Sequence, residues 1–116
     1  MYHQYSKSNT YLRKAIYEEY GKKCYYCGDL VMSKNMHIDH ILATNSKRED
    51  DQEFNDYLEE LYQSGFVIDS IENYLPTCAS CNMKKNNRNL SVGNLRYYHD
   101  MARTKSASIL KKMEEL

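Results

Sequence analysis

Two stretches of sequence are the main determinants of the fold: ENYLPTCASCNMKKN at residues 72–86 and CYYC at residues 24–27. Each contains a Cys-x-x-Cys pair, and the sequence has four cysteines in all: Cys24, Cys27, Cys78 and Cys81. Two such pairs supply four thiolates, which is a ligand set of tetrahedral structural zinc. Because residues 28–77 separate the pairs, folded structure has to bring them together.

A redox dithiol and four unrelated buried thiols are the alternatives to zinc. A zinc ion with four sulfur ligands has no open position for water, so this site would stabilise the fold rather than catalyse a reaction. The chain has 116 residues, of which 41% are hydrophobic, and small cores of this kind often recruit a metal. Catalytic residues therefore have to be sought elsewhere in the sequence.

The length predicts a single domain spanning residues 1–116. No apolar run approaches the roughly 20 residues that a membrane helix needs, so we expect no membrane insertion. Residues 1–10 are polar and lack the apolar stretch of a signal peptide, which favours a cytoplasmic, reducing location. In that environment clustered cysteines are more often metal ligands than disulfides.

The net charge of zero conceals an uneven distribution. Sixteen basic and sixteen acidic residues balance over the whole chain, but residues 49–72 contain nine acidic residues and no lysine or arginine. The rest of the chain therefore carries sixteen basic residues against seven acidic ones. A locally basic surface attracts polyanions whatever the net charge, although both segments are equally explained as solvated faces.

Hydrophobic periodicity predicts an α+β fold. A helix begins at a cap at Asn9 or Thr10 and runs to Tyr20, before Gly21. The other expected elements are an acidic helix at 51–64 inside an insertion at about 49–70, a helical turn at 82–87, a C-terminal helix at about 92–114, and extended segments at 30–32, 36–42 and 71–75. Alternation in the segment 36–42 places Asp39 and His40 on opposite faces of a strand.

The segment HIDHI at residues 37–41 lies between the cysteine pairs. Asn73 precedes the second pair, and Asn82 directly follows it. This order resembles the zinc-bearing members of the HNH endonuclease family, which show Cys-x-x-Cys, then Asp-His-Ile, then Asn-Leu-x-x-x-Cys-x-x-Cys-Asn-x-x-Lys. The match covers residues 24–86 with a longer middle. It is a His-Asn-Asn version, similar to the HNH domain of RNA-guided CRISPR nucleases.

The resemblance implies a ββα-metal, treble-clef-like core at about 22–90, with strands at 36–41 and 71–75 and a helix beginning near Ser80. It also implies cleavage of DNA to 5'-phosphate and 3'-hydroxyl ends. Carried over to this sequence, His40 is the general base, and Asp39 with Asn82 binds Mg²⁺ or Mn²⁺. Asn73 is the middle asparagine, which holds the loop that carries the base.

Duplex DNA is the expected substrate, and seven basic residues are expected to contact its backbone: Arg13, Lys14, Lys22, Lys23, Lys84, Lys85 and Arg88. The simpler interpretations are that these residues form a solvated face and that Asn73 and Asn82 are strand-end and helix-cap residues. His37 is expected to pack or to support a neighbour. The alternative function is a zinc-stabilised module that binds nucleic acid, or docks a partner protein or a second copy, without cutting alone.

Overall fold

The computed structural model of this protein describes residues 1–43, 46–86 and 90–116, and for Lys85 and Asn86 it describes the backbone alone. The described chain forms a small α+β fold with four α-helices, two short 3-10 helices (η) and one two-stranded antiparallel sheet. In chain order the elements are α1 (Thr10–Glu19), η1 (Ser33–Asn35), β1 (His37–His40), α2 (Gln52–Gln63), η2 (Ile71–Asn73), β2 (Tyr74–Thr77), α3 (Ala79–Asn86) and α4 (Val92–Glu115).

Side-chain caps set the starts of three helices. Asn9, Asp51 and Ser91 each accept a hydrogen bond from the backbone N–H three residues further on, at 3.0, 3.0 and 3.2 Å. These bonds satisfy donors that have no partner within the helix, so α1, α2 and α4 begin where the sequence predicts. Gly21, with φ of +77°, follows the end of α1 in a conformation that disfavours other residues.

The sheet is shorter than the sequence predicts. β1 pairs with β2 from His37 opposite Thr77 to His40 opposite Tyr74. The prediction of a strand at 71–75 is wrong for its first three residues, which form η2. The Asn73 side chain bonds the backbone of Leu42, and the strand begins at the next residue, Tyr74. The predicted extended segment at 30–32 contributes a single bridge, between Lys23 and Leu30.

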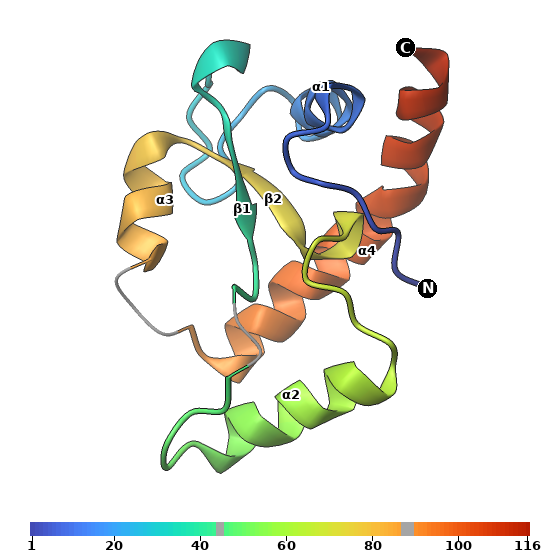
Figure 1. The fold of residues 1–116 in the computed structure, drawn as a ribbon. Helices are drawn as coiled ribbons and strands as arrows, with labels where there is room; N and C mark the ends of the chain where they lie inside the picture. Colours follow the sequence, from blue (N-terminus) through green and yellow to red (C-terminus); the bar gives the residue numbers. More distant parts are fainter. Residues whose placement is uncertain (44–45, 87–89) are drawn as a thin grey trace.

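Helix α4 is the longest element, and it contacts α1, α2 and η2 (Figure 1). One apolar cluster joins α2 and the first half of α4 to Leu42 and Leu75, and a second joins α1 and Ile109 of α4 to Ile38 and Tyr74. Together, the two strands contribute residues to both clusters. Helix α3 contacts β1 (Figure 1). Among the described residues no helix is both long and apolar enough to cross a membrane.

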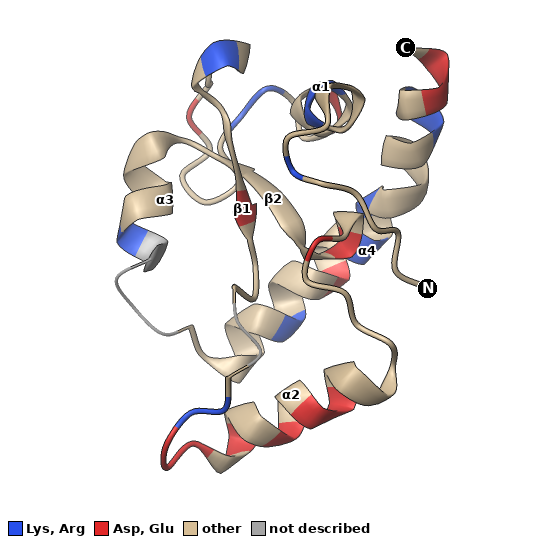
Figure 2. Cartoon of the chain, in the orientation of Figure 1, with Lys and Arg blue, Asp and Glu red and all other residues tan. Residues whose placement is uncertain are grey.

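The acidic helix α2 belongs to the core rather than standing apart from it. Its inner face buries Phe54, Tyr57, Leu58 and Leu61. Its acidic residues, which are red along α2 in Figure 2, are exposed. Glu72 has a different environment: it is only 2% exposed, and its carboxylate bonds the backbone and the ring of His3. The acidic segment seen in the sequence therefore divides into a solvated helix face and carboxylates with specific partners.

Candidate functional site

The four cysteines come together in one cluster. Their sulfur atoms all lie within 4.8 Å of one another, and the Sγ atoms of Cys27 and Cys78 are 4.0 Å apart. Ligands around tetrahedral zinc with Zn–S bonds of about 2.3 Å stand about 3.8 Å apart. No disulfide joins these four cysteines in the structure. The cluster can hold a metal ion, and its dimensions and donor atoms are consistent with structural zinc.

Backbone hydrogen bonds build the first cysteine turn and fasten it to the second. The N–H of Gly28 donates to Cys24 O at 2.9 Å, and Gly28 has a φ of +79°, which the tight turn requires. Tyr25 N–H donates to Pro76 O at 2.9 Å. Because Pro76 belongs to β2, which leads directly into Cys78, this bond sets one pair against the other.

The thiols have unequal acidities in this cluster. Burial disfavours the Cys24 thiolate, but hydrogen bonds from the backbone at Cys27 and Cys78 outweigh it and lower the Cys24 pKa to about 7. Burial and hydrogen bonds with the other thiols raise the Cys81 pKa to about 12. Four thiolates therefore do not coexist here without a cation, since metal binding is what displaces the remaining protons.

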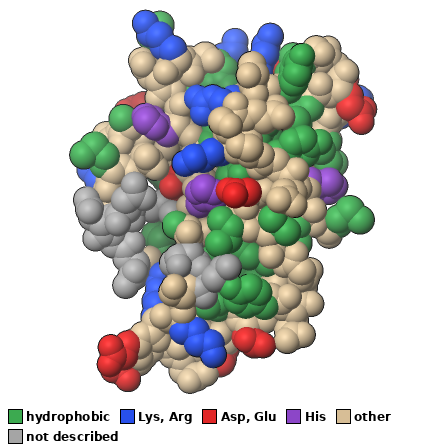
Figure 3. All heavy atoms as spheres, viewed as in Figure 1, with side chains coloured by type: hydrophobic (Ala, Val, Ile, Leu, Met, Phe, Trp, Pro, Cys, Tyr) green, Lys and Arg blue, Asp and Glu red, His purple; other side chains and the backbone are tan. Residues whose placement is uncertain are grey.

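A second group of polar residues surrounds a cavity of about 290 Å³ beside β1. It is lined by Lys7, Ser8, Arg13, His37, Ile38, Asp39, His40, Ala43 and Asn82. Figure 3 shows basic side chains beside a histidine and an acidic side chain in the middle of this face. Asp39, His40 and Asn82 thus share one cavity although the strand and helix that carry them are far apart in sequence.

Tyr26 holds the Asp39 carboxylate in this cavity. The Tyr26 hydroxyl donates to Asp39 Oδ2 at 3.0 Å, and Asp39 is only 5% exposed. Burial is the main cause of a raised Tyr26 pKa, and the charge of Asp39 adds to it, so the phenol remains a donor. Because Tyr26 lies inside the first cysteine turn, this turn contributes both to the cysteine cluster and to the cavity.

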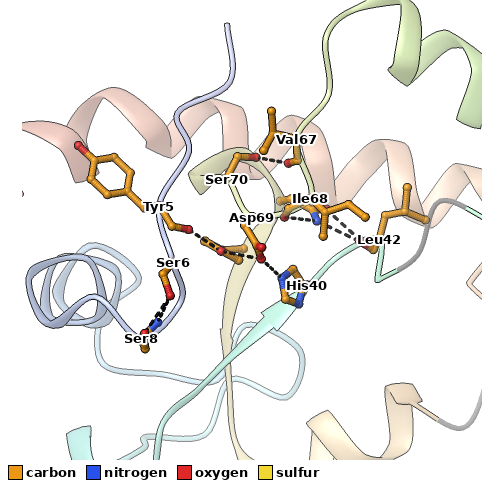
Figure 4. A network of polar contacts seen from close by, with 11 residues as sticks. Tyr5, Ser6, Ser8, His40, Leu42, Val67, Ile68, Asp69 and Ser70 are labelled. Atoms are coloured by element: carbon orange, nitrogen blue, oxygen red, sulfur yellow. Dashed lines mark hydrogen bonds and ion pairs between the residues drawn. The ribbon is translucent and has the colours of Figure 1, made fainter.

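His40 is held by a carboxylate from the segment before η2. Its Nε2 atom lies 2.7 Å from Asp69 Oδ1, and the Tyr74 hydroxyl donates to the same oxygen at 3.2 Å and to Tyr5 O at 2.6 Å (Figure 4). The hydrogen bond with His40 lowers the pKa of Asp69. A carboxylate accepting from Nε2–H leaves Nδ1 as the basic nitrogen of a neutral imidazole.

Asn73 lies outside the cavity, fully buried behind the loop that follows β1. Its Oδ1 accepts from Leu42 N–H at 3.0 Å, and its Nδ2 donates to Leu42 O and Ile68 O at 3.0 and 2.9 Å. His99 Nε2 lies 2.8 Å from the same Oδ1, and its Nδ1 lies 2.5 Å from the Tyr57 hydroxyl. Because Oδ1 only accepts, Nε2 carries the proton and Tyr57 donates to Nδ1.

Of the predicted DNA-contacting lysines whose side chains are described, Lys22, Lys23 and Lys84 do not line the cavity. Lys22 lines a neighbouring pocket with Arg13, Lys23 sits in the bridge with Leu30, and Lys84 is exposed on α3. The backbone at Lys85 is helical, whereas Arg88 lies outside the described residues. Among the described residues, the cationic side chains at the cavity are those of Lys7 and of Arg13, and the sequence singled out only Arg13 as a DNA contact.

Three supporting residues were missed by the sequence analysis: Tyr26, Asp69 and His99. Asp69 was counted only as one of nine acidic residues, and Tyr26 only as the residue before Cys27. His99 falls on the buried face of α4, four residues after Leu95. That helical spacing was the one available signal for His99, whereas the partners of Tyr26 and Asp69 depend on tertiary contacts.

A scan of protein-family models found no match to this chain, and searches of curated proteins and of solved structures found none either. Its function is therefore argued from its own residues and their geometry. Of the described residues, only the four cysteines form a cluster of three or more side chains of the metal-binding types His, Cys, Asp and Glu.

Proposed function

We propose that this protein is a metal-dependent HNH endonuclease that hydrolyses DNA phosphodiester bonds to 5'-phosphate and 3'-hydroxyl ends. The observation that carries the proposal is the shared cavity of Asp39, His40 and Asn82. On this proposal β1, β2 and α3 form the ββα-metal core, and the four cysteines bind structural zinc. The succession of two short antiparallel strands and a helix that contacts β1 supports it.

His40 is proposed as the general base. A neutral imidazole has the affinity for a proton that activation of water near neutral pH requires. With Nε2 turned to Asp69, Nδ1 takes the proton from the attacking water, and the Asp69 carboxylate stabilises the imidazolium that results. Asp69 is thus a positioning residue, because it acts through His40 and does not itself touch the phosphate.

Asp39 and Asn82 are proposed to hold the catalytic Mg²⁺ or Mn²⁺. Carboxylate and amide oxygens are hard ligands that suit these ions. When bound, such a cation stabilises negative charge on the phosphate and on the departing oxygen. Tyr26 fixes one carboxylate oxygen of Asp39, so the ligand is oriented before the cation and the substrate arrive.

Asn73 supports the site from a buried position outside the cavity. Its side chain bonds both backbone polar groups of Leu42, two residues after His40. His99 and Tyr57 in turn fix the orientation of the Asn73 amide. The buried chain of hydrogen bonds therefore holds the end of β1 in place while the cavity remains accessible to substrate.

The direct test is incubation of the metal-loaded protein with supercoiled plasmid and Mg²⁺ or Mn²⁺, beside His40→Ala and an EDTA control. We expect nicked or linear plasmid with the unmodified protein alone. Cutting that persists in His40→Ala at the original rate would contradict the proposed base. Binding of plasmid without cutting would favour the alternative function, a nucleic-acid-binding or partner-docking module.

A further inference from the structure

The N-terminal segment contributes to the cavity although it precedes the stretch that carries the resemblance. Lys7 and Ser8 lie in this segment, Arg13 lies on α1, and all three line the cavity that holds Asp39 and His40. Nothing in the proposed chemistry of the two strands and α3 requires these residues. Lys7 and Arg13 favour a ligand with negative charge. On the proposed function, the negative charge of Asp39 in the same cavity is neutralised by the bound cation.

The segment is fixed firmly enough to place Lys7. Tyr5 N–H donates to Asp69 O at 3.0 Å, and Ile71 N–H donates to His3 O at 3.0 Å, so the segment runs along the residues before β2 as a strand would. The buried carboxylate of Glu72 accepts from the backbone N–H of His3 at 2.7 Å. Chain ends usually fray unless such contacts hold them.

Both cationic residues line the same cavity as Asp39 and His40. The hydrogen bond with His40 is the main cause of the lowered pKa of Asp69, and the positive charge of Lys7 contributes to the same shift. Arg13 donates one N–H to Met36 O at 2.7 Å, next to the start of β1. A guanidinium has five N–H donors, so Arg13 keeps others for a phosphate.

We infer that Lys7 and Arg13 form a phosphate-binding subsite that holds the DNA strand next to the scissile bond. This inference rests on the proposed nuclease function and extends it to residues outside the nuclease core. Arg13 also lines the neighbouring pocket with Lys14 and Lys22, so the basic surface continues from the cavity along α1. The strand backbone follows this surface away from His40.

The experiment measures binding of a short fluorescent DNA duplex by anisotropy at several salt concentrations, in a His40→Ala background that leaves the duplex uncut. We expect Lys7→Gln to weaken binding about tenfold in moderate salt and to reduce the salt slope by about 1, since one phosphate contact is lost. Lys111→Gln, which removes an exposed lysine near the end of α4, is the matched control and should bind as the background protein does.

Lys7 is exposed, so Lys7→Gln should melt at an unchanged temperature. Arg13→Gln also loses the bond to Met36 and is interpreted only together with its melting temperature. With His40 restored, Lys7→Gln should raise the DNA concentration for half-maximal cutting, because the variant loses a phosphate contact.

Unchanged affinity and salt slope in Lys7→Gln would overturn the subsite, even if the unmodified protein cuts DNA. Absence of any DNA binding by the background protein would overturn it as well. Conversely, the expected losses in a protein that does not cut would leave the phosphate subsite standing and contradict the nuclease function. The two proposals therefore fail through different measurements.

Discussion

Asp39 and His40 are neighbours in sequence whose side chains are held by different parts of the chain. Asp39 accepts from Tyr26 in the first cysteine turn, and His40 is paired with Asp69 just before η2. Their identities and order were recognisable from the sequence because they form part of a local motif. Their supporting partners were not, since each partner reaches the site only through the tertiary fold.

Replacing Asp69 by asparagine tests how His40 is oriented. We expect Asp69→Asn to lower the maximal rate of DNA cutting by at least about tenfold with little change in half-saturating DNA, because the imidazole loses its charged partner. The substitution should not affect folding, since the Asp69 side chain is 59% exposed. Single-turnover cutting of a labelled duplex measures the effect, and Asp56→Asn on the exposed face of α2 is the control.

The pH dependence of this effect follows from the lowered Asp69 pKa. The carboxylate is charged throughout the neutral range, and the pairing is lost only as pH falls through its folded-state pKa, below the ordinary value of about 3.9. The deficit of Asp69→Asn should therefore be present at every neutral pH. A deficit that appears only at one end of the neutral range, or none at all, would contradict the positioning role.

The helices were predictable from sequence because their signals are local. The caps at Asn9, Asp51 and Ser91 and the apolar spacing place α1, α2 and α4 within about two residues of the structure. The strand at 71–75 was wrong for its first three residues, which form η2, and the Asn73 side chain there bonds the loop after β1. Short strands depend on such partners more than helices do.

Helix α2 is a core element, so truncating its inner face should be costly. We expect Leu61→Ala to lower the free energy of unfolding by about 3 kcal/mol, because Leu61 is buried at 3% exposure and its loss leaves a cavity. Glu59→Gln, on the exposed face of the same helix, should change it by less than about 0.5 kcal/mol. Urea titration measures both, and equal stability of the two variants would show that α2 is a dispensable insertion.

At the scale of the whole molecule, the cysteine cluster joins segments that residues 28–77 separate. Tyr25 is bonded to β2, Tyr26 to Asp39, and β2 leads into Cys78, so the cluster and the cavity rest on the same backbone. The sequence predicted that the pairs meet. It did not predict that Lys7 lines the cavity, because Lys7 belongs to no motif and reaches the cavity only through contacts of the folded chain.

Removing one cysteine should therefore unfold more than the cluster. We expect Cys78→Ser to lose the metal ion and most of the cooperative thermal transition, since metal binding in a chain of this size contributes directly to folding. Ser80→Ala, an exposed change between the same two cysteines, should retain both. Native mass spectrometry and thermal melting measure the outcome, and a folded Cys78→Ser protein with zinc bound would contradict the four-thiolate site.

The most direct test of the central claim is the rate at which Asp39→Asn cuts a labelled DNA duplex over a range of Mg²⁺ concentrations, beside Asp56→Asn. Asparagine keeps the shape of Asp39 and can still accept from Tyr26, but it lacks the charge that holds the cation. We predict a fall of at least about 100-fold for Asp39→Asn and none for Asp56→Asn. Cutting by Asp39→Asn at the unmodified rate, with the same Mg²⁺ dependence, would contradict the proposal that Asp39 holds the catalytic cation.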